Sequence, residues 1–322
     1  MTSGPRELLT DTTEVECRPP RELRFRAMGS DAHVIVSGDL VDGRDPVRVA
    51  RDRVEELESR WSRFRSTSEV SELSRRAGEW VAVSTDTELL ARRSVEAWRL
   101  TGSSYDPTVL GDILRAGYDR TYDEVASAPA AGASELWLGC ADIEIREGAV
   151  RLPFGVGFDA GGIGKGLAAD LVAEELMALG AAGVCINLGG DLRVVGVAPD
   201  GAWVIGLELG AGTDEPFGTL SLAAGGVATS TTLRRHWEID GEIRHHLIDP
   251  ATGQPSDSDL VSVSVVAGTA WVAEVLAKAL LLRGSEHAFD LIGGTGVEAI
   301  TVDRDGSVRT SAGFARFAEV ER

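Results

Sequence analysis

The sequence predicts an α+β fold in which antiparallel sheets are flanked by helices. Short strands with turn residues between them follow one another closely over residues 193–248, and this spacing favours an antiparallel sheet over a βαβ succession. Apolar residues at helical spacing predict amphipathic helices over 47–64 and 85–100, and a buried helix over 269–282. A chain of 322 residues, 43% apolar and 26% charged, is typical of one large globular domain or two intertwined ones.

The beginning of the chain divides into a lead-in and a hairpin. Residues 1–22 are rich in proline and poor in apolar side chains, so we expect them to be disordered. Residues 23–37 alternate as a strand or hairpin that is broken at 28–30. We expect residues 23–322 to form a single domain in two interlocked lobes, with the break in the Ala/Ser/Gly-rich stretch near 126–134.

The two N-terminal helices carry recognisable stripes and caps. The helix over 47–64 places one apolar stripe toward the core: Val47, Ala50, Val54, Leu57 and Trp61. Ser68 can cap a short helix that runs through Leu73. Thr85 with Glu88 three residues later predicts a capping box at the start of the next helix.

A glycine-rich turn at 159–166 lies between a strand predicted over 151–158 and an amphipathic helix that stops at Gly180. Free N–H groups at a helix N-terminus, the helix dipole and Lys165 together favour an anion such as a diphosphate. Neither common phosphate motif fits, because a Walker loop needs Ser or Thr where Gly166 stands and the Rossmann spacing is one residue short. The same turn is also compatible with plain strand-to-helix punctuation.

The remainder of the chain reads mainly as strands. A buried strand over 183–188 ends in a second glycine turn at 187–191. A short helix is expected over 286–292, and a hairpin over 297–309 that turns at Asp305–Gly306. The other strands are predicted over 193–198, 203–209, 218–222, 227–230, 236–239, 244–248 and 260–267.

Charge and cysteine usage limit the partners and the compartment. A net charge of −19 and a pI near 4.7 argue against nucleic-acid and anionic-membrane partners, so any phosphate site must be locally basic. We expect no membrane span, because Glu274 and Lys278 interrupt the longest apolar run, and no signal peptide in residues 1–20. The three cysteines, at positions 17, 140 and 185, lack metal-ligand spacing and indicate free thiols in a reducing compartment, by default the cytoplasm.

Polar clusters later in the chain are candidates for chemistry. Residues 229–236 gather hydroxyls with Arg234, Arg235 and His236, which suits phosphate oxygens, although a hydroxyl-rich edge strand would look the same. Residues 245–255 bring two histidines and Asp249 into a tight turn. A general base or acid could act there, but Asp before Pro and Gly is also ordinary turn chemistry.

Only two of the 32 basic residues are lysines, Lys165 and Lys278. Such usage hints that a compact ammonium is needed at these positions, with chance survival as the alternative. Glu274 and Lys278 lie four residues apart on an apolar helix, so we expect them to pair. Burying both charges would be costly unless they served a site.

Five segments in this order and spacing resemble the ApbE family of FAD:protein FMN transferases: DAGGIGKG (159–166), NLGGD (187–191), VATS (227–230), HLIDPATG (246–253) and AEVLAKAL (273–280). Residues 25–30, 62–73 and 105–109 match the family's N-terminal motifs. The resemblance covers nearly the whole chain after residue 22. It implies a two-lobed T-fold architecture that binds FAD between the lobes.

The resemblance also implies an activity and a set of site residues. Such enzymes cleave FAD with the help of magnesium, attach FMN to a threonine or serine of an acceptor flavoprotein, and release AMP. On this pattern Gly162, through its carbonyl, and Glu274 would hold the metal, while His246 and Lys278 would take part in catalysis. Thr229 and Ser230 belong to the hydroxyl cluster expected to bind the cofactor. The remaining residues implied to line the FAD site are Met28, Phe64, Tyr105, Asp106, Asp159, Lys165 and Leu247.

The chain departs from the family pattern at three positions. The family usually has Asp where Glu274 stands, Thr where Lys278 stands and Gly where Thr231 stands. Glutamate keeps a hard oxygen ligand, whereas an ammonium has no lone pair to give a metal. Two other functions therefore remain open: an FAD-binding or flavin-delivery protein without transfer, and an FAD pyrophosphatase that uses water in place of the acceptor.

Overall fold

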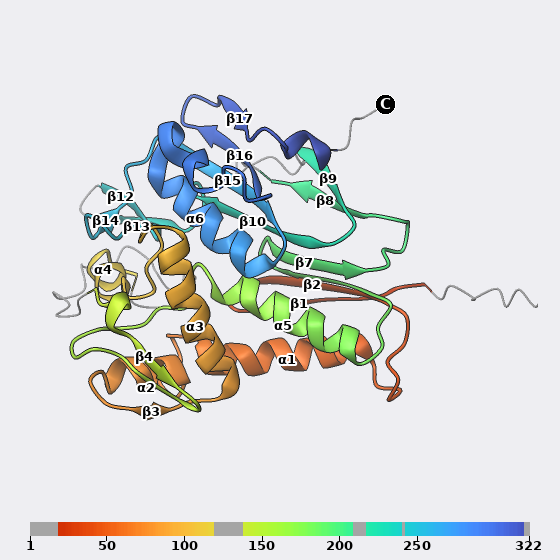
Figure 1. The fold of residues 1–322 in the computed structure, drawn as a ribbon, viewed down its shortest axis with the longest axis horizontal. Helices are drawn as coiled ribbons and strands as arrows, with labels where there is room; N and C mark the ends of the chain where they lie inside the picture. The colour runs from red at the N-terminus through yellow and green to blue at the C-terminus, as the bar shows by residue number, and fades with distance from the viewer. Residues whose placement is uncertain (1–18, 119–137, 209–216, 240–241, 319–322) are drawn as a thin grey trace, which may run out of the picture.

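The computed structural model describes residues 19–118, 138–208, 217–239 and 242–318. Its centre is an eight-stranded sheet in the order β1, β2, β6, β7, β10, β15, β16, β17 (Figure 1), in which every neighbouring pair is antiparallel. The predicted antiparallel sheet is therefore confirmed. The strands are β1 (Arg21–Ala27), β2 (Ser30–Ser37), β6 (Gly183–Leu188), β7 (Asp191–Gly196), β10 (Gly225–Thr231), β15 (Leu260–Ala267), β16 (Glu298–Asp303) and β17 (Val308–Thr310).

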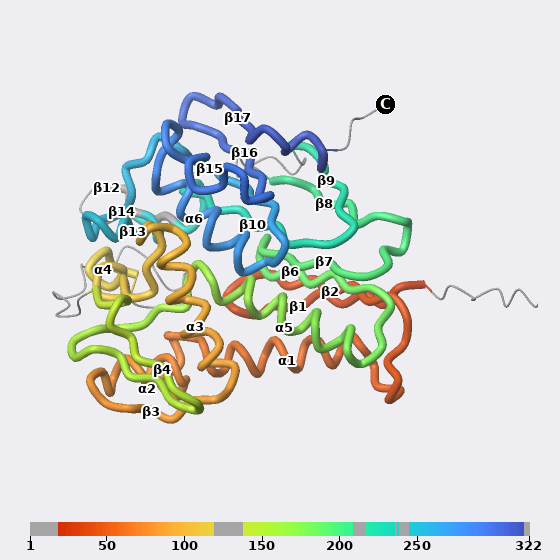
Figure 2. The backbone as a smooth tube through the Cα atoms, viewed as in Figure 1, coloured from red at the N-terminus to blue at the C-terminus, as the bar shows by residue number. Residues whose placement is uncertain are grey.

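β1 and β2 form the hairpin expected at the start of the chain. Met28 and Gly29 have φ values of 51° and 67°, and Ala27 pairs with Ser30 across the turn. Positive φ at both central residues matches the twist of the paired strands, which explains the tight turn. β1 starts at Arg21, before the segment in which a strand was predicted. β2 in turn pairs with β6, a strand far away in the sequence (Figure 2).

Two helices, α5 (Gly164–Ala178) and α6 (Ala270–His287), pack on the same face of the sheet and against each other (Figure 1). The hairpin of β8 (Trp203–Leu207) and β9 (Gly218–Leu222) covers the opposite face. Strand alternation separates these layers, because Val265 belongs to the core under the helices and Val266 to the core under the hairpin. The sheet is thus the middle of three layers.

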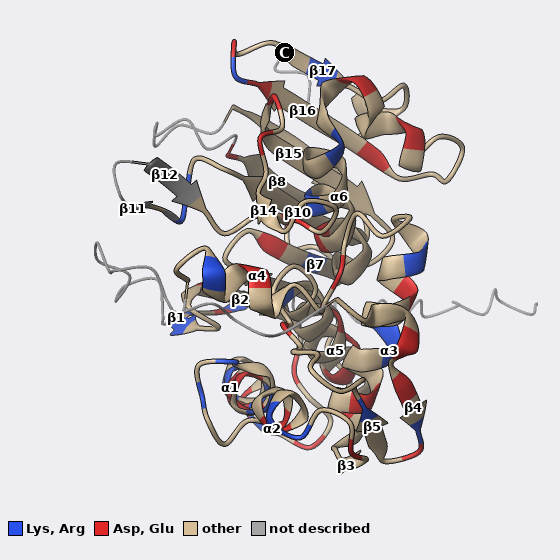
Figure 3. Cartoon of the chain, turned by 90° about the vertical axis from the view of Figure 1, so that its left-hand side faces the viewer, with Lys and Arg blue, Asp and Glu red and all other residues tan. Residues whose placement is uncertain are grey.

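Helices α1 (Pro46–Trp61), α2 (Glu69–Arg75), α3 (Thr85–Leu100) and α4 (Leu110–Arg115) form the other part of the molecule, together with a sheet of β3 (Val81–Ala82), β5 (Ala149–Arg151) and β4 (Glu144–Arg146). The predicted apolar stripe of α1 is entirely buried, which confirms that helix. Acidic and basic residues alternate on the remaining surface of α1 and on α2 (Figure 3). A large excess of acidic residues is therefore compatible with local charge pairing.

The helix caps follow the sequence at one site and not at the other. Ser68 accepts a hydrogen bond from the Ser71 N–H at 3.2 Å, as predicted for α2. The predicted capping box at the start of α3 is wrong, because Ser84 is the N-cap and accepts from the Thr87 N–H at 3.3 Å. The N–H of Ser84 donates to Glu69 on α2 at 3.0 Å. Glu69 therefore accepts the hydrogen bond from the N-cap amide that a capping box assigns to Glu88.

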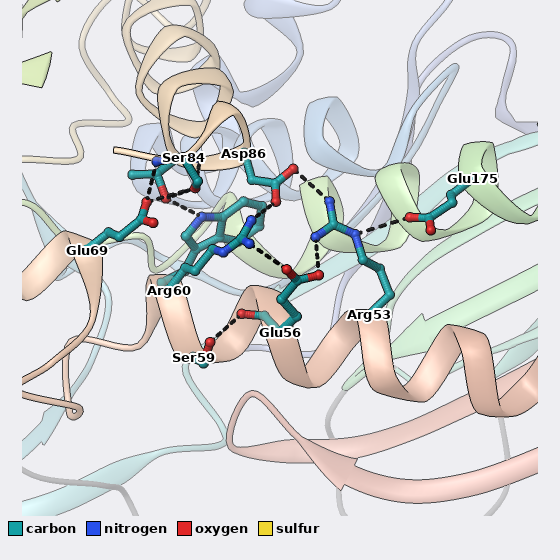
Figure 4. Close-up of polar contacts among 10 residues, drawn as sticks. Arg53, Glu56, Ser59, Arg60, Glu69, Ser84, Asp86 and Glu175 are labelled. Atoms are coloured by element: carbon teal, nitrogen blue, oxygen red, sulfur yellow. Dashed lines mark hydrogen bonds and ion pairs between the residues drawn. The ribbon is translucent and has the colours of Figure 1, made fainter. Parts of the chain in front are cut away.

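Charged side chains tie α1 to α3 and α5 (Figure 4). Asp86 on α3 accepts hydrogen bonds from Arg53, at 2.7 Å, and from Arg60 on α1. Arg53 also reaches Glu175 on α5 at 3.1 Å. Only 11% of the Asp86 side chain is exposed, so this network stabilises the packing of three helices more than exposed surface ion pairs would.

The strand predicted over 151–158 is wrong beyond Arg151, where β5 ends. Pro153 has no N–H for a ladder, Gly155 has a φ of 74°, and Phe154 is 91% exposed. Four apolar residues at alternating positions, Leu152, Phe154, Val156 and Phe158, therefore produced a strand pattern that the backbone interrupts.

Several short elements complete the fold. The strand predicted over 244–248 is divided between two hairpins, and the helix predicted over 286–292 is the end of α6 followed by a 3₁₀ turn. These elements are β11 (His236–Ile239), β12 (Glu242–His245), β13 (Ile248–Asp249), β14 (Gln254–Pro255), η2 (Cys140–Asp142), η3 (Ala288–Leu291) and η4 (Phe314–Arg316). The expected lobe break at 126–134 lies outside the described residues, and the single-domain organisation stays a prediction. None of the helices in the described ranges has the length and apolarity to cross a membrane.

Candidate active site

The glycine turn leads into α5, as the sequence predicts, and brings its first turn against α6. Gly162 has a φ of 90°, a conformation that favours glycine. A Cβ on Gly166 would lie 2.5 Å from the carbonyl oxygen of Ala270, so a side chain here would push the two helices apart. The Gly166 N–H donates to Glu274 Oε2 at 2.7 Å. This amide at the α5 N-terminus, which we expected to be free for an anion, is therefore bound by a carboxylate of α6.

Lys165 lies between two buried carboxylates. Its Nζ contacts Asp191 Oδ2 at the start of β7 and Glu274 Oε1 on α6, the latter at 3.2 Å. Burial lowers the pKa of Lys165, and the charge of Glu274 opposes this shift. The lysine thereby fastens α5 to both α6 and the second glycine turn. Asp191, which the sequence analysis did not select as a site residue, was detectable as the polar end of that turn.

Lys278 is the second buried ammonium of the site, and it does not pair with Glu274 as the helical spacing predicts. Both Glu274 oxygens are already bound, one by the Gly166 N–H and one by Lys165. Only 5% of Lys278 is exposed. Its Nζ lies 5.6 Å from the centroid of the Tyr105 ring, and its Cδ lies 3.0 Å from where a Cβ on Gly162 would be. The missing side chain of Gly162 thus makes the room that Lys278 fills.

Two further carboxylates lie on loops beside these lysines. Asp106 accepts from the Thr108 N–H at 2.7 Å, and burial raises its pKa. Asp159 Oδ1 lies 3.4 Å from Nε of Arg63, a residue that the sequence analysis did not select. Burial lowers the pKa of Lys278, and Asp159, Glu274 and Asp106, in that order, oppose the shift. These acidic groups oppose the loss of the Lys278 proton without contacting the lysine directly.

His246 is a neutral imidazole next to several cations. Burial lowers its pKa well below the ordinary value, and the positive charges of Arg235 and Lys278 lower it further. Its Nδ1 is buried and, among the described residues, has no hydrogen-bond partner. The adjacent Leu247 is buried in the hydrophobic core. An unpartnered nitrogen on a neutral imidazole can accept a proton from a ligand hydroxyl.

Arg235 connects this cluster to the N-terminal hairpin. It adopts a left-handed φ of 55°, unusual for a long side chain, and its guanidinium donates to the Gly29 carbonyl at 3.3 Å. Its charge also acts on Lys165. The hydroxyl-rich segment signalled Arg235 in the sequence, but only the structure shows that it reaches the Met28–Gly29 turn.

Three other residues predicted to line the site are held by their neighbours in the fold. Thr229 shares a 2.7 Å hydrogen bond with Ser264 on the neighbouring strand, and Ser230 follows it on β10. β10 lies between β7 and β15, but β7 pairs only with Gly225, Gly226 and Val227. Among the described residues, the hydroxyl-bearing end of β10 is therefore paired on the β15 side alone, which agrees with the edge-strand alternative. Phe64 is 39% exposed and stacks on the guanidinium of Arg63 at 4.2 Å.

Asp249 serves the turn after β13 by accepting from the Ala251 N–H at 2.9 Å. This bond supports the turn interpretation of its sequence. The turn also borders a pocket of about 460 Å³ that is lined by Trp98, Ser104 and Cys140. Of the predicted site residues, Asp106 alone lines it, so the pocket adjoins the lysine cluster rather than containing it.

The donor set around Gly162 does not fit a divalent metal. Magnesium and calcium need several oxygen ligands at close range, and Glu274 is the expected carboxylate ligand. Its two oxygens are engaged by an amide and an ammonium, and the position of the second ligand is held by Lys278, which has no lone pair. Two ammonium groups would repel a cation placed between them.

A buried cluster of cations, carboxylates and one histidine of lowered pKa thus surrounds the glycine turn of an α+β fold. The model of the ApbE family matches residues 28–301, and the chain belongs to that family.

Individual relatives agree with this assignment. The chain is 27% identical to the FAD:protein FMN transferase of Vibrio cholerae, over 82% of this chain and 80% of that protein. It is 34% identical to the FAD:protein FMN transferase of Treponema pallidum over about half of each chain, 50% of this one and 47% of the other. The crystal structure of the ApbE protein of Thermotoga maritima superposes with a TM-score of 0.82, at 26% identity, over 94% of this chain and 100% of that one.

Proposed function

We propose that this protein is an FAD:protein FMN transferase, which cleaves the diphosphate of FAD, attaches FMN to a threonine or serine of an acceptor flavoprotein, and releases AMP. The observation that carries the proposal is the convergence of Lys165, Lys278 and Arg235 on neutral His246, in a chain that matches the ApbE family over most of its length. A molecule with a net charge of −19 repels polyanions elsewhere, so a diphosphate is favoured beside Lys278, which forms no ion pair among the described residues.

Positioning and charge neutralisation supply most of the catalysis in phosphoryl transfer. The acceptor hydroxyl oxygen attacks the phosphorus of the FMN half, and the bond from that phosphorus to the bridging oxygen breaks. AMP leaves with the bridging oxygen, while His246 takes the hydroxyl proton as general base. Lys278 and Arg235 neutralise the charge of the diphosphate. These steps use no metal, because the donor set around Gly162 does not fit one.

The proposed FAD site extends from the lysine cluster toward the N-terminal hairpin and the Arg63–Phe64 stack. The bond from Arg235 to the Gly29 carbonyl and the contact of Arg63 with Asp159 support this extent. The residues proposed to line it are Met28, Phe64, Tyr105, Asp106, Asp159, Lys165, Thr229, Ser230 and Leu247. We place the activity in the cytoplasm on the strength of free Cys140 and Cys185, an assignment that fractionation of the producing cells tests.

The purified protein, FAD and a candidate acceptor test the proposal together. We expect one FMN per acceptor by intact mass and an equal amount of AMP by chromatography. Free FMN and AMP without acceptor labelling would indicate hydrolysis by water. FAD binding, seen as quenched flavin fluorescence, with no AMP after prolonged incubation with several acceptors would indicate a flavin-delivery protein and contradict the proposal.

A further inference from the structure

We propose that the Lys278 ammonium supplies, as a built-in cation, the positive charge that a divalent metal would otherwise bring to the diphosphate, so that this chain acts without a metal. The inference deepens the transferase function proposed above and rests on it. On this inference, the lysine that stands where the family usually has a metal-ligating threonine replaces the charge of the metal, and the activity is kept.

Lys278 lies close to the glycine turn. Its Cδ lies 3.0 Å and its Nζ 3.6 Å from where a Cβ on Gly162 would be, so the ammonium occupies the space directly under the glycine turn. Nζ also faces the Tyr105 ring at 5.6 Å. A side chain on Gly162 would displace the lysine. The turn and the ammonium are therefore fitted to each other.

Lys278 is buried without a direct carboxylate partner among the described residues. In the described ranges it forms no ion pair, although it is 95% buried, because Glu274 is committed to Lys165 and the Gly166 N–H. A buried ammonium without a direct partner is unfavourable, and the charges of Asp159 and Asp106 offset this only at a distance. An incoming diphosphate oxygen would provide the missing direct partner. A purely structural lysine would be expected to have one already.

Lys165 cannot play the same part equally well. Asp191 and Glu274 already neutralise it, so it contributes geometry more than free positive charge. A metal at Glu274 would have to displace Lys165 from that carboxylate and lie next to a second ammonium. The contacts of Glu274 with Lys165 and the Gly166 N–H, together with the ammonium of Lys278, therefore exclude a divalent ion from this position. One compact charge remains to neutralise the phosphate of the leaving AMP.

Two variants of Lys278 test the inference. Lys278→Thr restores a hydroxyl with lone pairs, and Lys278→Met keeps the length of the side chain without charge or oxygen. Three quantities are measured for each protein: turnover to AMP with EDTA and with added magnesium, Mn²⁺ binding by electron paramagnetic resonance, and FAD binding by flavin fluorescence. Circular dichroism confirms that each variant is folded.

We expect wild-type turnover to change less than twofold between EDTA and magnesium, with no bound Mn²⁺ at millimolar concentration. Lys278→Met should lose at least tenfold in turnover under both conditions. Lys278→Thr should lose the EDTA-resistant turnover. It should also gain Mn²⁺ binding, because without the second ammonium Mn²⁺ can compete with Lys165 for Glu274. Wild-type turnover that EDTA abolishes and magnesium restores would overturn the inference.

The Mn²⁺ measurement separates this inference from the transferase proposal. If no acceptor is labelled under any condition, the transferase proposal fails, but Mn²⁺ binding with FAD present still decides the role of Lys278. Stoichiometric Mn²⁺ in the wild type overturns the inference, and Mn²⁺ bound by Lys278→Thr alone supports it. If neither protein binds Mn²⁺, an unchanged FAD affinity in Lys278→Met overturns it, whereas weakened affinity supports a built-in cation.

Discussion

Replacing Lys165 with methionine removes the cation that lies between Asp191 and Glu274. Each of these carboxylate side chains is only 5% exposed. Removing one member of a buried ion pair costs about 3–5 kcal/mol, because the partner is left as an uncompensated charge. Glu274 keeps its hydrogen bond to the Gly166 N–H, so most of the deficit falls on Asp191. We expect the free energy of unfolding to fall by about 3–5 kcal/mol.

Urea denaturation at pH 7.5 and at lower pH measures this loss and its origin. In the variant, the folded state binds protons at these carboxylates more readily than the unfolded state, so lowering the pH stabilises it relative to the wild type. The deficit should therefore shrink as the pH falls. The matched double variant Lys165→Met with Asp191→Asn removes the second charge and should regain at least half of the loss.

A deficit below about 1 kcal/mol, the value for an exposed ion pair, would refute the reasoning. So would a deficit that is the same at both pH values and in the double variant, since that outcome would assign the cost to packing. In a folded sample the same substitution should weaken FAD binding by about 1.5–3 kcal/mol if Lys165 also donates to the diphosphate.

Three further predictions use matched controls or a change of pH. Gly166→Ala should lower the free energy of unfolding, measured by urea titration, by about 1–3 kcal/mol, because its Cβ would lie 2.5 Å from the backbone of α6. The control Gly218→Ala places a Cβ with no neighbour within 4 Å and should change the free energy of unfolding far less. Equal effects would contradict the close-approach argument. Burial raises the pKa of Asp170 to about 6, and a raised carboxyl pKa adds stability below pH 4 that is lost as the pH rises through 6. The stability of the wild type relative to Asp170→Asn should therefore grow by about 2–3 kcal/mol from pH 7 to pH 4, and a flat difference would show that burial does not govern this group. Arg235→Ala should weaken FAD binding by about 1.5–3 kcal/mol in fluorescence titrations, and the exposed Arg234→Ala should leave it unchanged. Similar losses in both would mean that Arg235 acts only through the overall field.

Local pattern was sufficient wherever a residue's role depends on near neighbours in the chain. The buried stripe of α1, the Ser68 cap, the tight β1–β2 turn and the antiparallel order of short strands could all be predicted. Several residues of the candidate site could also be selected, because glycine turns, hydroxyl-rich segments and two isolated lysines stand out in an arginine-rich chain. Arg63 and Asp191 were not selected.

Contacts between distant segments decided the rest. Over 151–158, apolar spacing predicted a strand, but β5 ends at Arg151, and proline and glycine interrupt the backbone after it. At α3, Glu69 from another helix replaced the expected capping partner. Helical spacing likewise predicted a Glu274–Lys278 pair, yet an amide and a lysine more than a hundred residues earlier bind Glu274.

The sequence by itself determined the family and the fold class, and it selected Lys165, Glu274 and Lys278 but not Asp191 or Arg63. Only the tertiary structure decided which of these side chains bind one another, because a buried carboxylate binds whichever donors the packing of α5 on α6 brings within reach. That packing assigns Glu274 to Lys165 and the α5 N-terminus. It leaves Lys278 as a buried ammonium under the glycine turn, without a direct carboxylate partner among the described residues.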